Sequence, residues 1–157
     1  MIGEGRESKK DNDLFYTCSL IDYIARKTKN TRADVVNKLG KQRIDKIYDL
    51  ADVYHCDNID RVSDDFIEEA GIQEGNFDNV GECKYSIPSH WDIGKVYKRL
   101  IKMVAADENI GIVDALKKYT IPSSVQKLMT TTAVYITKIR HIYLNRIGKT
   151  ECCKRNG

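Results

Sequence analysis

The sequence predicts an all-α protein of about seven helices, arranged in two small packed helical units. Apolar residues recur at the three- and four-residue spacing of helices over most of the chain. Only two prolines occur among the 157 residues, which leaves long stretches free to be helical. Several of these stretches begin with a helix-capping residue and end with a glycine. A chain of this length can bury a hydrophobic core without disulfides or a metal.

The N-terminal unit is expected over residues 13–75, after a disordered leader of residues 1–12. Thr31 and Asp34 have the spacing of a capping box, and Gly40 and Gly71 are suited to the left-handed conformation that ends a helix. Ser63 is expected to cap the last helix of the unit. The four helices are expected at about Asp13–Thr28, Thr31–Leu39, Lys41–Tyr54 and Ser63–Ala70.

A glycine- and asparagine-containing stretch over residues 71–83 is the best candidate for a boundary. The C-terminal unit is expected over residues 84–148, followed by a flexible tail of residues 149–157. Ser89 and Asp92 form a second capping-box pair. Gly94, alone inside a helical pattern, is interpreted as a small residue that permits close helix packing. The helices of this unit are expected at about Ser89–Ala105, Gly111–Tyr119 and Ser123–Ile147.

Cysteine usage and the lack of apolar segments predict a cytoplasmic protein. The five cysteines are odd in number and scattered, whereas a secreted disulfide framework uses an even number in a shorter chain. The first residues are polar and do not resemble a signal peptide. No stretch approaches the 18 apolar residues that indicate a membrane span.

The sequence indicates neither catalysis nor cofactor binding. His55, His90 and His141 do not form a local zinc-binding spacing, and the acids around Asp57 lack the glycine and the ligand positions of a calcium loop. Glycine-rich phosphate loops and nucleophile elbows are also missing from the sequence. Cys18 lies on an apolar helix face and is interpreted as a core residue. The prediction is therefore a non-catalytic protein with no metal and no cofactor.

Charge is distributed unevenly along the chain. Residues 1–75 carry 12 basic and 16 acidic residues, whereas residues 76–157 carry 14 basic and 7 acidic residues. The densest acidic stretch, from Asp45 to Glu69, has a net charge of −7. From it we select an acidic patch as a partner-binding candidate: Asp45, Asp49, Asp52, Asp60, Asp64 and Asp65.

The last expected helix supplies the opposite charge. Its apolar residues are expected to pack on the helix that contains Ile93 and Val104, which leaves a basic ridge as the second partner-binding candidate: Lys138, Arg140, Arg146 and Lys149. The ridge is expected to meet an acidic surface, either on a partner protein or on the acidic patch of a second copy, which would make a salt-sensitive homodimer. An ordinary solvated basic face is the alternative interpretation.

The chain resembles small, uncharacterised helical proteins of Firmicutes that are encoded beside toxin-like proteins of the ADP-ribosyltransferase fold. The matching segments are Leu14-Phe15-Tyr16-x-Cys18-x-Leu20-Ile21-x-Tyr23, Asp34-Val35-Val36, Ile47-Tyr48-x-Leu50, Val53-Tyr54-His55 and Asp64-Asp65-Phe66-Ile67, with a further block at Trp91-Asp92-Ile93-Gly94-Lys95-Val96-Tyr97. The resemblance covers less than half of the chain and rests mostly on core positions. It implies an all-α fold and an antitoxin-like or accessory role.

Two functions follow from these observations. The first is a protein-interaction module, antitoxin-like or accessory to a toxin-like protein encoded nearby, with no membrane involvement. The second is a DNA-binding regulator, in which the segments Thr31–Leu39 and Lys41–Val53 form a helix-turn-helix. The residues that would head its recognition helix are Lys41, Gln42, Arg43 and Lys46. Asp45, Asp49 and Asp52 on that second helix would face phosphates, which disfavours the second function.

Overall fold

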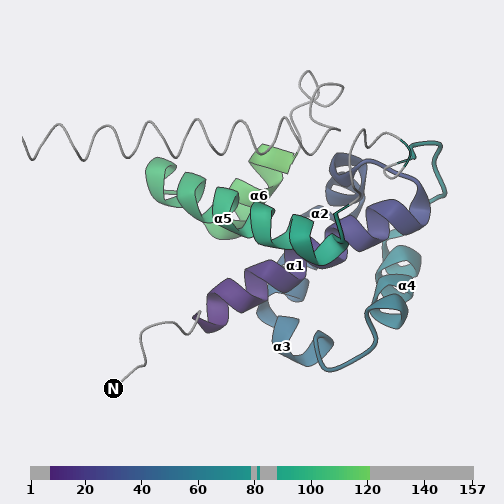
Figure 1. Ribbon diagram of the computed structural model, residues 1–157, viewed down its shortest axis with the longest axis horizontal. Coiled ribbons are helices and arrows are strands. Elements are labelled where there is room, and N and C mark those ends of the chain that lie inside the picture. The colour runs from purple at the N-terminus through teal and green to yellow at the C-terminus, as the bar shows by residue number, and fades with distance from the viewer. Residues whose placement is uncertain (1–7, 79–80, 82–87, 121–157) are drawn as a thin grey trace, which may run out of the picture.

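The computed structural model describes residues 8–78, 81 and 88–120, and these residues confirm the all-α fold class (Figure 1). Within the described part of the chain there are six helices and no strand. The helices are α1 (Lys9–Thr28), α2 (Arg32–Asp49), α3 (Ala51–Tyr54), α4 (Ile59–Ala70), α5 (His90–Glu108) and α6 (Ile112–Thr120). The expected helix over residues 123–147 and the tail over 149–157 lie outside the described residues.

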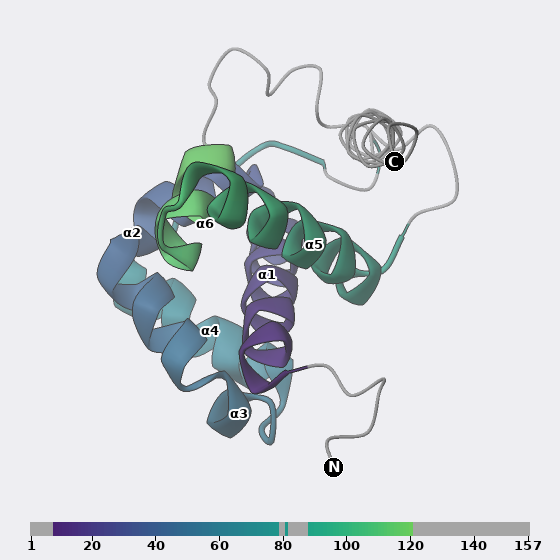
Figure 2. The same cartoon turned by 90° about the vertical axis from the view of Figure 1, so that its left-hand side faces the viewer.

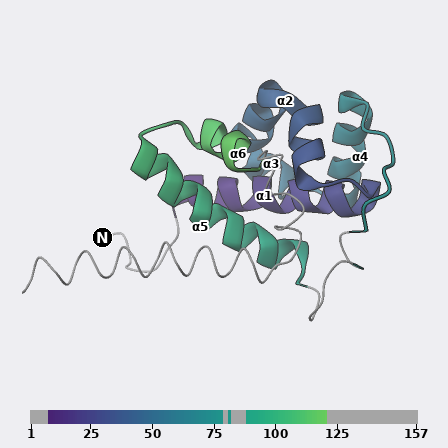
Figure 3. The same ribbon diagram turned by 90° about the horizontal axis from the view of Figure 1, so that it is seen from above.

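Helix α1 is the centre of the fold. Twelve of its 20 residues are buried, so its apolar surface extends around most of the helix instead of forming one stripe. Helices α2, α3, α4 and α5 contact α1, while α6 packs on α2 and α5 (Figure 2). Helix α5 crosses α1 obliquely with the most extensive helix–helix contact among the described helices (Figure 3). One hydrophobic core draws residues from all six helices, so the two expected units share it.

Local signals set most helix ends as expected. The capping boxes of Thr31 with Asp34 and of Ser89 with Asp92 are both formed, and Gly71 ends α4 in the left-handed conformation. Gly40, with φ of 68° and ψ of 171°, kinks the chain between the two halves of α2. Positive φ at this position explains why a glycine is required there.

Two predicted helix starts are wrong. Helix α1 begins at Lys9 instead of Asp13, because Ser8 caps it by accepting a hydrogen bond from the Asp11 backbone N–H. Helix α4 begins at Ile59 with Asn58 as its cap, so Ser63 lies inside the helix. The Ser63 hydroxyl is buried and donates to the Asp60 carbonyl at 2.5 Å. Ser63 therefore satisfies its own hydroxyl within the helix and does not cap it.

The crossing of α1 and α5 depends on Gly94. A Cβ atom at this position would overlap the Ser19 hydroxyl oxygen and would lie 3.1 Å from the Phe15 carbonyl oxygen. The Ser19 hydroxyl is held in place because it donates to that same carbonyl at 2.8 Å. This confirms the interpretation of Gly94 as a residue that permits close helix packing.

A buried ionic cluster joins α1, α2 and the start of α5. Asp22 has no exposed surface, and its carboxylate oxygens lie 2.7 Å from Arg26 Nε and 2.5 Å from Arg32 Nε. Arg26 also donates to the Pro88 carbonyl at 2.7 Å, just before α5. The Arg32 guanidinium lies over the Tyr97 ring of α5, 5.4 Å from its centroid. Burial of a carboxylate requires such partners, so these segments are tied to one point of α1.

None of the described helices is long and apolar enough to cross a membrane.

We predict that Gly94→Ala destabilises the protein. In a helix interior alanine is favoured over glycine by about 0.8–1 kcal/mol. Adding a methyl group to a close-packed contact costs about 1–3 kcal/mol. Here the added methyl group would press on the backbone carbonyl of Phe15. Denaturant unfolding should therefore show a lower free energy of unfolding for Gly94→Ala than for the parent. Adding Ser19→Ala, with Ser19→Ala alone as the control, should recover part of that loss. A Gly94→Ala protein more stable than the parent would contradict the close crossing.

We predict that Asp22→Asn is strongly destabilising. The substitution leaves two arginines without their shared carboxylate, and breaking a buried ion pair costs about 3–5 kcal/mol. The matched control is Asp114→Asn, which breaks an ion pair of 2.6 Å with Lys41 in which both side chains are about half exposed. Urea unfolding should show a much larger decrease in the free energy of unfolding for Asp22→Asn than for the control. Equal losses would show that the cluster does not hold the helices together.

Candidate functional site

The structure divides the predicted acidic patch between two places. Asp60, Asp64 and Asp65 lie on α4, whereas Asp45, Asp49 and Asp52 lie on α2 and α3. All of them except half-buried Asp45 are exposed. Asp60 and Asp64 form ion pairs with Lys27, whereas Asp49 and Asp52 form ion pairs with Lys10 and Lys9.

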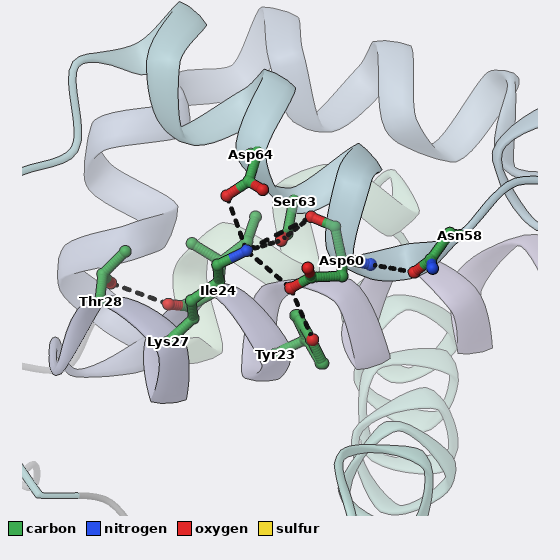
Figure 4. A network of polar contacts seen from close by, with 8 residues as sticks. All are labelled: Tyr23, Ile24, Lys27, Thr28, Asn58, Asp60, Ser63 and Asp64. Carbon is green, nitrogen blue, oxygen red and sulfur yellow. Dashed lines mark hydrogen bonds and ion pairs between the residues drawn. The ribbon is translucent and has the colours of Figure 1, made fainter.

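The α4 acids hold their own helix against α1 (Figure 4). The Lys27 ammonium lies 2.6 Å from a carboxylate oxygen of Asp60 and 2.6 Å from one of Asp64, and it donates to the Ser63 hydroxyl at 3.3 Å. The Tyr23 hydroxyl donates to the same Asp60 oxygen at 2.9 Å. The hydrogen bond from Lys27 is the largest cause that lowers the pKa of Asp60, and the hydrogen bond from Tyr23 is the second. We call this group the Lys27 latch; it occupies two of the predicted partner-binding acids.

The opposite side of α4 is held to α2 in the same way. Glu69 forms ion pairs with Arg43 at 3.4 Å and with Lys46 at 3.2 Å, and its carbonyl accepts from Arg43 at 2.9 Å. Asp65 is exposed and forms no ion pair with any described residue. Most of the charge on α4 is therefore used within the chain.

The acids around α3 are held less tightly. Asp49 lies 3.5 Å from Lys10, and Asp52 lies 3.3 Å from Lys9, with all four side chains mostly exposed. Between and beside these acids are Leu50 and Val53, 43% and 62% exposed, which are the large exposed hydrophobic residues in the described part of the chain. We call Asp49, Leu50, Asp52 and Val53 the α3 corner. The α3 corner therefore places two exposed apolar side chains beside two exposed carboxylates.

A pocket of about 430 Å³ opens beside the α3 corner, between the first half of α1 and α3. Its lining residues are Lys9, Asn12, Asp13, Phe15, Tyr16, Ala51, Asp52 and His55. The Trp91 ring adjoins the aromatic wall, with its centroid 5.6 Å from Phe15 and 6.3 Å from His55. The volume falls within the range of ligand pockets.

Two lining residues are fixed by burial. Tyr16 is almost fully buried, which raises its pKa to about 12, and its hydroxyl donates to the Tyr54 carbonyl at 3.2 Å. Asp13 is 2% exposed as a residue, and the Lys9 ammonium lies 3.4 Å from its carboxylate. The pocket therefore combines rigid aromatic walls with a buried negative charge.

Sequence reasoning missed this pocket and the exposure of Leu50 and Val53. The pocket forms where residues 9–16 meet residues 51–55, and that juxtaposition is set by tertiary packing. One available signal is that Phe15, Tyr16, His55 and Trp91 all fall within the segments that carry the family resemblance. These positions were interpreted as core, whereas Phe15 and Trp91 are half-buried and His55 is exposed.

A second cavity, of about 650 Å³, lies between the end of α1 and residues 74–78. The two cations in its lining already have partners, since Arg26 pairs with Asp22 and Lys29 pairs with Glu74 at 2.8 Å. Both cations of this cavity therefore form ion pairs within the chain.

The thiol chemistry of the described cysteines matches the core interpretation of Cys18. Cys18 is buried, and burial raises the pKa of its thiol well above the ordinary value, which disfavours the reactive thiolate. Cys56 is exposed. Among the described residues no group of three or more histidine, cysteine or acidic side chains could hold a metal ion. The non-catalytic, cofactor-free character of the protein stays a prediction.

The basic residues of the predicted helix-turn-helix are engaged in contacts within the chain. Lys41 pairs with Asp114 of α6 at 2.6 Å, and Arg43 and Lys46 both pair with Glu69. DNA binding stays a prediction that these contacts do not favour. The predicted basic ridge lies outside the described residues; it comprises Lys138, Arg140, Arg146 and Lys149.

Comparisons with known proteins found no match: no protein-family model, no curated protein and no solved structure is similar to this chain.

We predict that Cys56 reacts with iodoacetamide well before Cys18 in the native protein. The reason is that Cys56 is solvent-accessible, whereas the Cys18 thiol is buried and its pKa is raised. Peptide mapping by mass spectrometry should find Cys18 labelled only after urea is added. Rapid native labelling of Cys18 would contradict its place in the core.

Proposed function

We propose that this protein is a non-catalytic protein-interaction module that binds a basic partner through the α3 corner. The observation that carries the proposal is the exposure of Leu50 and Val53 between Asp49 and Asp52, next to the aromatic pocket. An apolar centre with an acidic rim fits a partner segment that is itself apolar and basic.

The state of the ion pairs supports the α3 corner over α4 as the binding surface. The α4 acids of the Lys27 latch lie 2.6 Å from their cation, so a partner would have to break a network that anchors the helix. The contacts of Asp49 and Asp52 are 3.5 and 3.3 Å long and exposed. Exposed pairs of this kind contribute little, so a partner can replace them readily.

The resemblance suggests where to find the partner. We propose that it is a toxin-like protein encoded nearby, with this chain in an antitoxin-like or accessory role. A second copy of this chain, contributing the basic ridge, is the other source of a basic segment. Light scattering of the purified protein at low and high salt separates the two sources, since a homodimer held by charge should dissociate as salt rises.

We predict that Leu50→Ser with Val53→Ser weakens the complex by about tenfold or more, because apolar residues at the centre of an interface carry much of the binding energy. The measurement is affinity purification after co-expression with the neighbouring protein, followed by titration calorimetry. Both side chains are substantially exposed, so the free protein should keep the parent's unfolding midpoint.

Charge variants supply the matched control. Asp49→Asn with Asp52→Asn should weaken the complex and reduce its salt dependence. Asp65→Asn with Glu68→Gln removes the same charge from α4 at two exposed acids and should leave affinity nearly unchanged. If the α4 pair weakens binding as much as the α3 pair, the α3 corner is not the interface. If no complex forms at micromolar concentration with the neighbouring protein or between copies, the proposed function fails.

A further inference from the structure

The pocket beside α3 places a lysine between two carboxylates without fitting it closely. Lys9 Nζ lies 3.4 Å from Asp13 and 3.3 Å from Asp52. Charge-assisted hydrogen bonds between a cation and a carboxylate are shorter, about 2.7–2.9 Å. The Lys9 side chain is 62% exposed, so the ammonium is neither buried by the pocket nor tightly held in it.

The Lys27 latch shows that this fold can hold the same arrangement tightly. Lys27 is also an α1 lysine between two aspartates, and both of its contacts are 2.6 Å. The difference is that Lys27 contacts both carboxylates at 2.6 Å (Figure 4), whereas Lys9 borders a pocket of about 430 Å³. The pocket is thus larger and wider than an ammonium group requires.

The pocket walls indicate which cation would fit better. Phe15, Tyr16 and His55 line it, and aromatic faces attract cations. A guanidinium is planar, presents five donors and stacks on aromatic rings while it bridges carboxylates, whereas an ammonium is a compact point charge. The buried carboxylate of Asp13 makes the site favourable to a cation that can reach it, because a carboxylate at depth needs a charged partner.

We propose that this pocket binds one arginine side chain of the partner, and that Lys9 occupies the site in the free protein as an internal competitor. The inference rests on the proposed function and names the residue that the partner contributes. On binding, the guanidinium bridges Asp13 and Asp52 and stacks on the aromatic wall, while the Lys9 ammonium moves into solvent. The neighbouring α3 corner then takes the apolar residues that flank the arginine.

The test uses blocked glycine–arginine–glycine and glycine–lysine–glycine tripeptides with the full ¹⁵N-labelled chain. Two-dimensional NMR titration should show shifts at residues 12–16, at residues 51–55 and at the Trp91 indole, with tighter binding of the arginine peptide. Lys9→Met should increase the affinity by about twofold to fivefold, because it removes an exposed competing ion pair. Asp13→Asn and, separately, Asp52→Asn should each weaken binding.

The control is Lys10→Met, which removes the same charge one residue away. Lys10 pairs with Asp49 and lies over the Tyr48 ring, outside the pocket lining. Relative to the parent, the Lys10→Met variant should change its affinity for the arginine peptide less than the Lys9→Met variant does. The inference is overturned if the two variants behave alike, if the lysine peptide binds as well as the arginine peptide, or if no pocket residue shifts. Asp52→Asn keeps the test valid should Asp13→Asn fail to fold.

The two proposals fail in different ways. If the partner binds through Leu50 and Val53 but the arginine peptide does not bind, only the arginine site is wrong. If the arginine peptide binds in the pocket but no complex depends on the α3 corner, the proposed interface is wrong and the pocket remains as a guanidinium site.

Discussion

The buried carboxylate of Asp22 is the constraint on which the arrangement of the helices depends. A fully buried charge on the central helix is tolerated only with cationic partners, and here Arg26 of α1 and Arg32 of α2 supply them. Arg26 also donates a hydrogen bond to the backbone carbonyl of Pro88, just before α5, and the Arg32 guanidinium lies over the Tyr97 ring of α5. The central helix is thereby tied to the start of α2 and to α5 by directional contacts, in addition to the non-directional hydrophobic core.

The tightness of the α1–α5 crossing follows from a second, steric constraint. Gly94 lets the two backbones approach at Ser19, and the same approach brings Trp91, one turn earlier on α5, against Phe15. The Trp91 ring beside the aromatic wall is therefore placed by how α5 packs on α1. A site built this way rests on helices whose positions are fixed by packing, which favours a preformed binding geometry.

Helix α1 uses two lysines in contrasting ways. Lys27 closes a tight network that holds α4, while Lys9 bridges two aspartates loosely at the edge of the pocket. In the first arrangement the carboxylates of Asp60 and Asp64 hold α4 in place, whereas in the second the carboxylates of Asp13 and Asp52 can exchange Lys9 for another cation. That contrast separates structural acids from acids that are available to a partner, although Asp52, Asp60 and Asp64 all belong to the same acidic stretch of sequence.

The sequence by itself determined the helical class, the capping boxes at Thr31 and Ser89, the stop at Gly71 and the small-residue role of Gly94. The first three depend on interactions within about four residues. A lone glycine inside a helical pattern indicates a packing role, although its partner Ser19 is set by tertiary structure. Only the tertiary structure decided that Asn58, and not Ser63, caps α4. Both residue types can cap, and the choice follows from where α4 lies against Lys27. Tertiary structure also decided which acids are paired and where a pocket forms. The ion pairs that α3 and α4 make with other helices join residues more than 20 positions apart, and the charge or apolarity of a residue does not specify a distant partner.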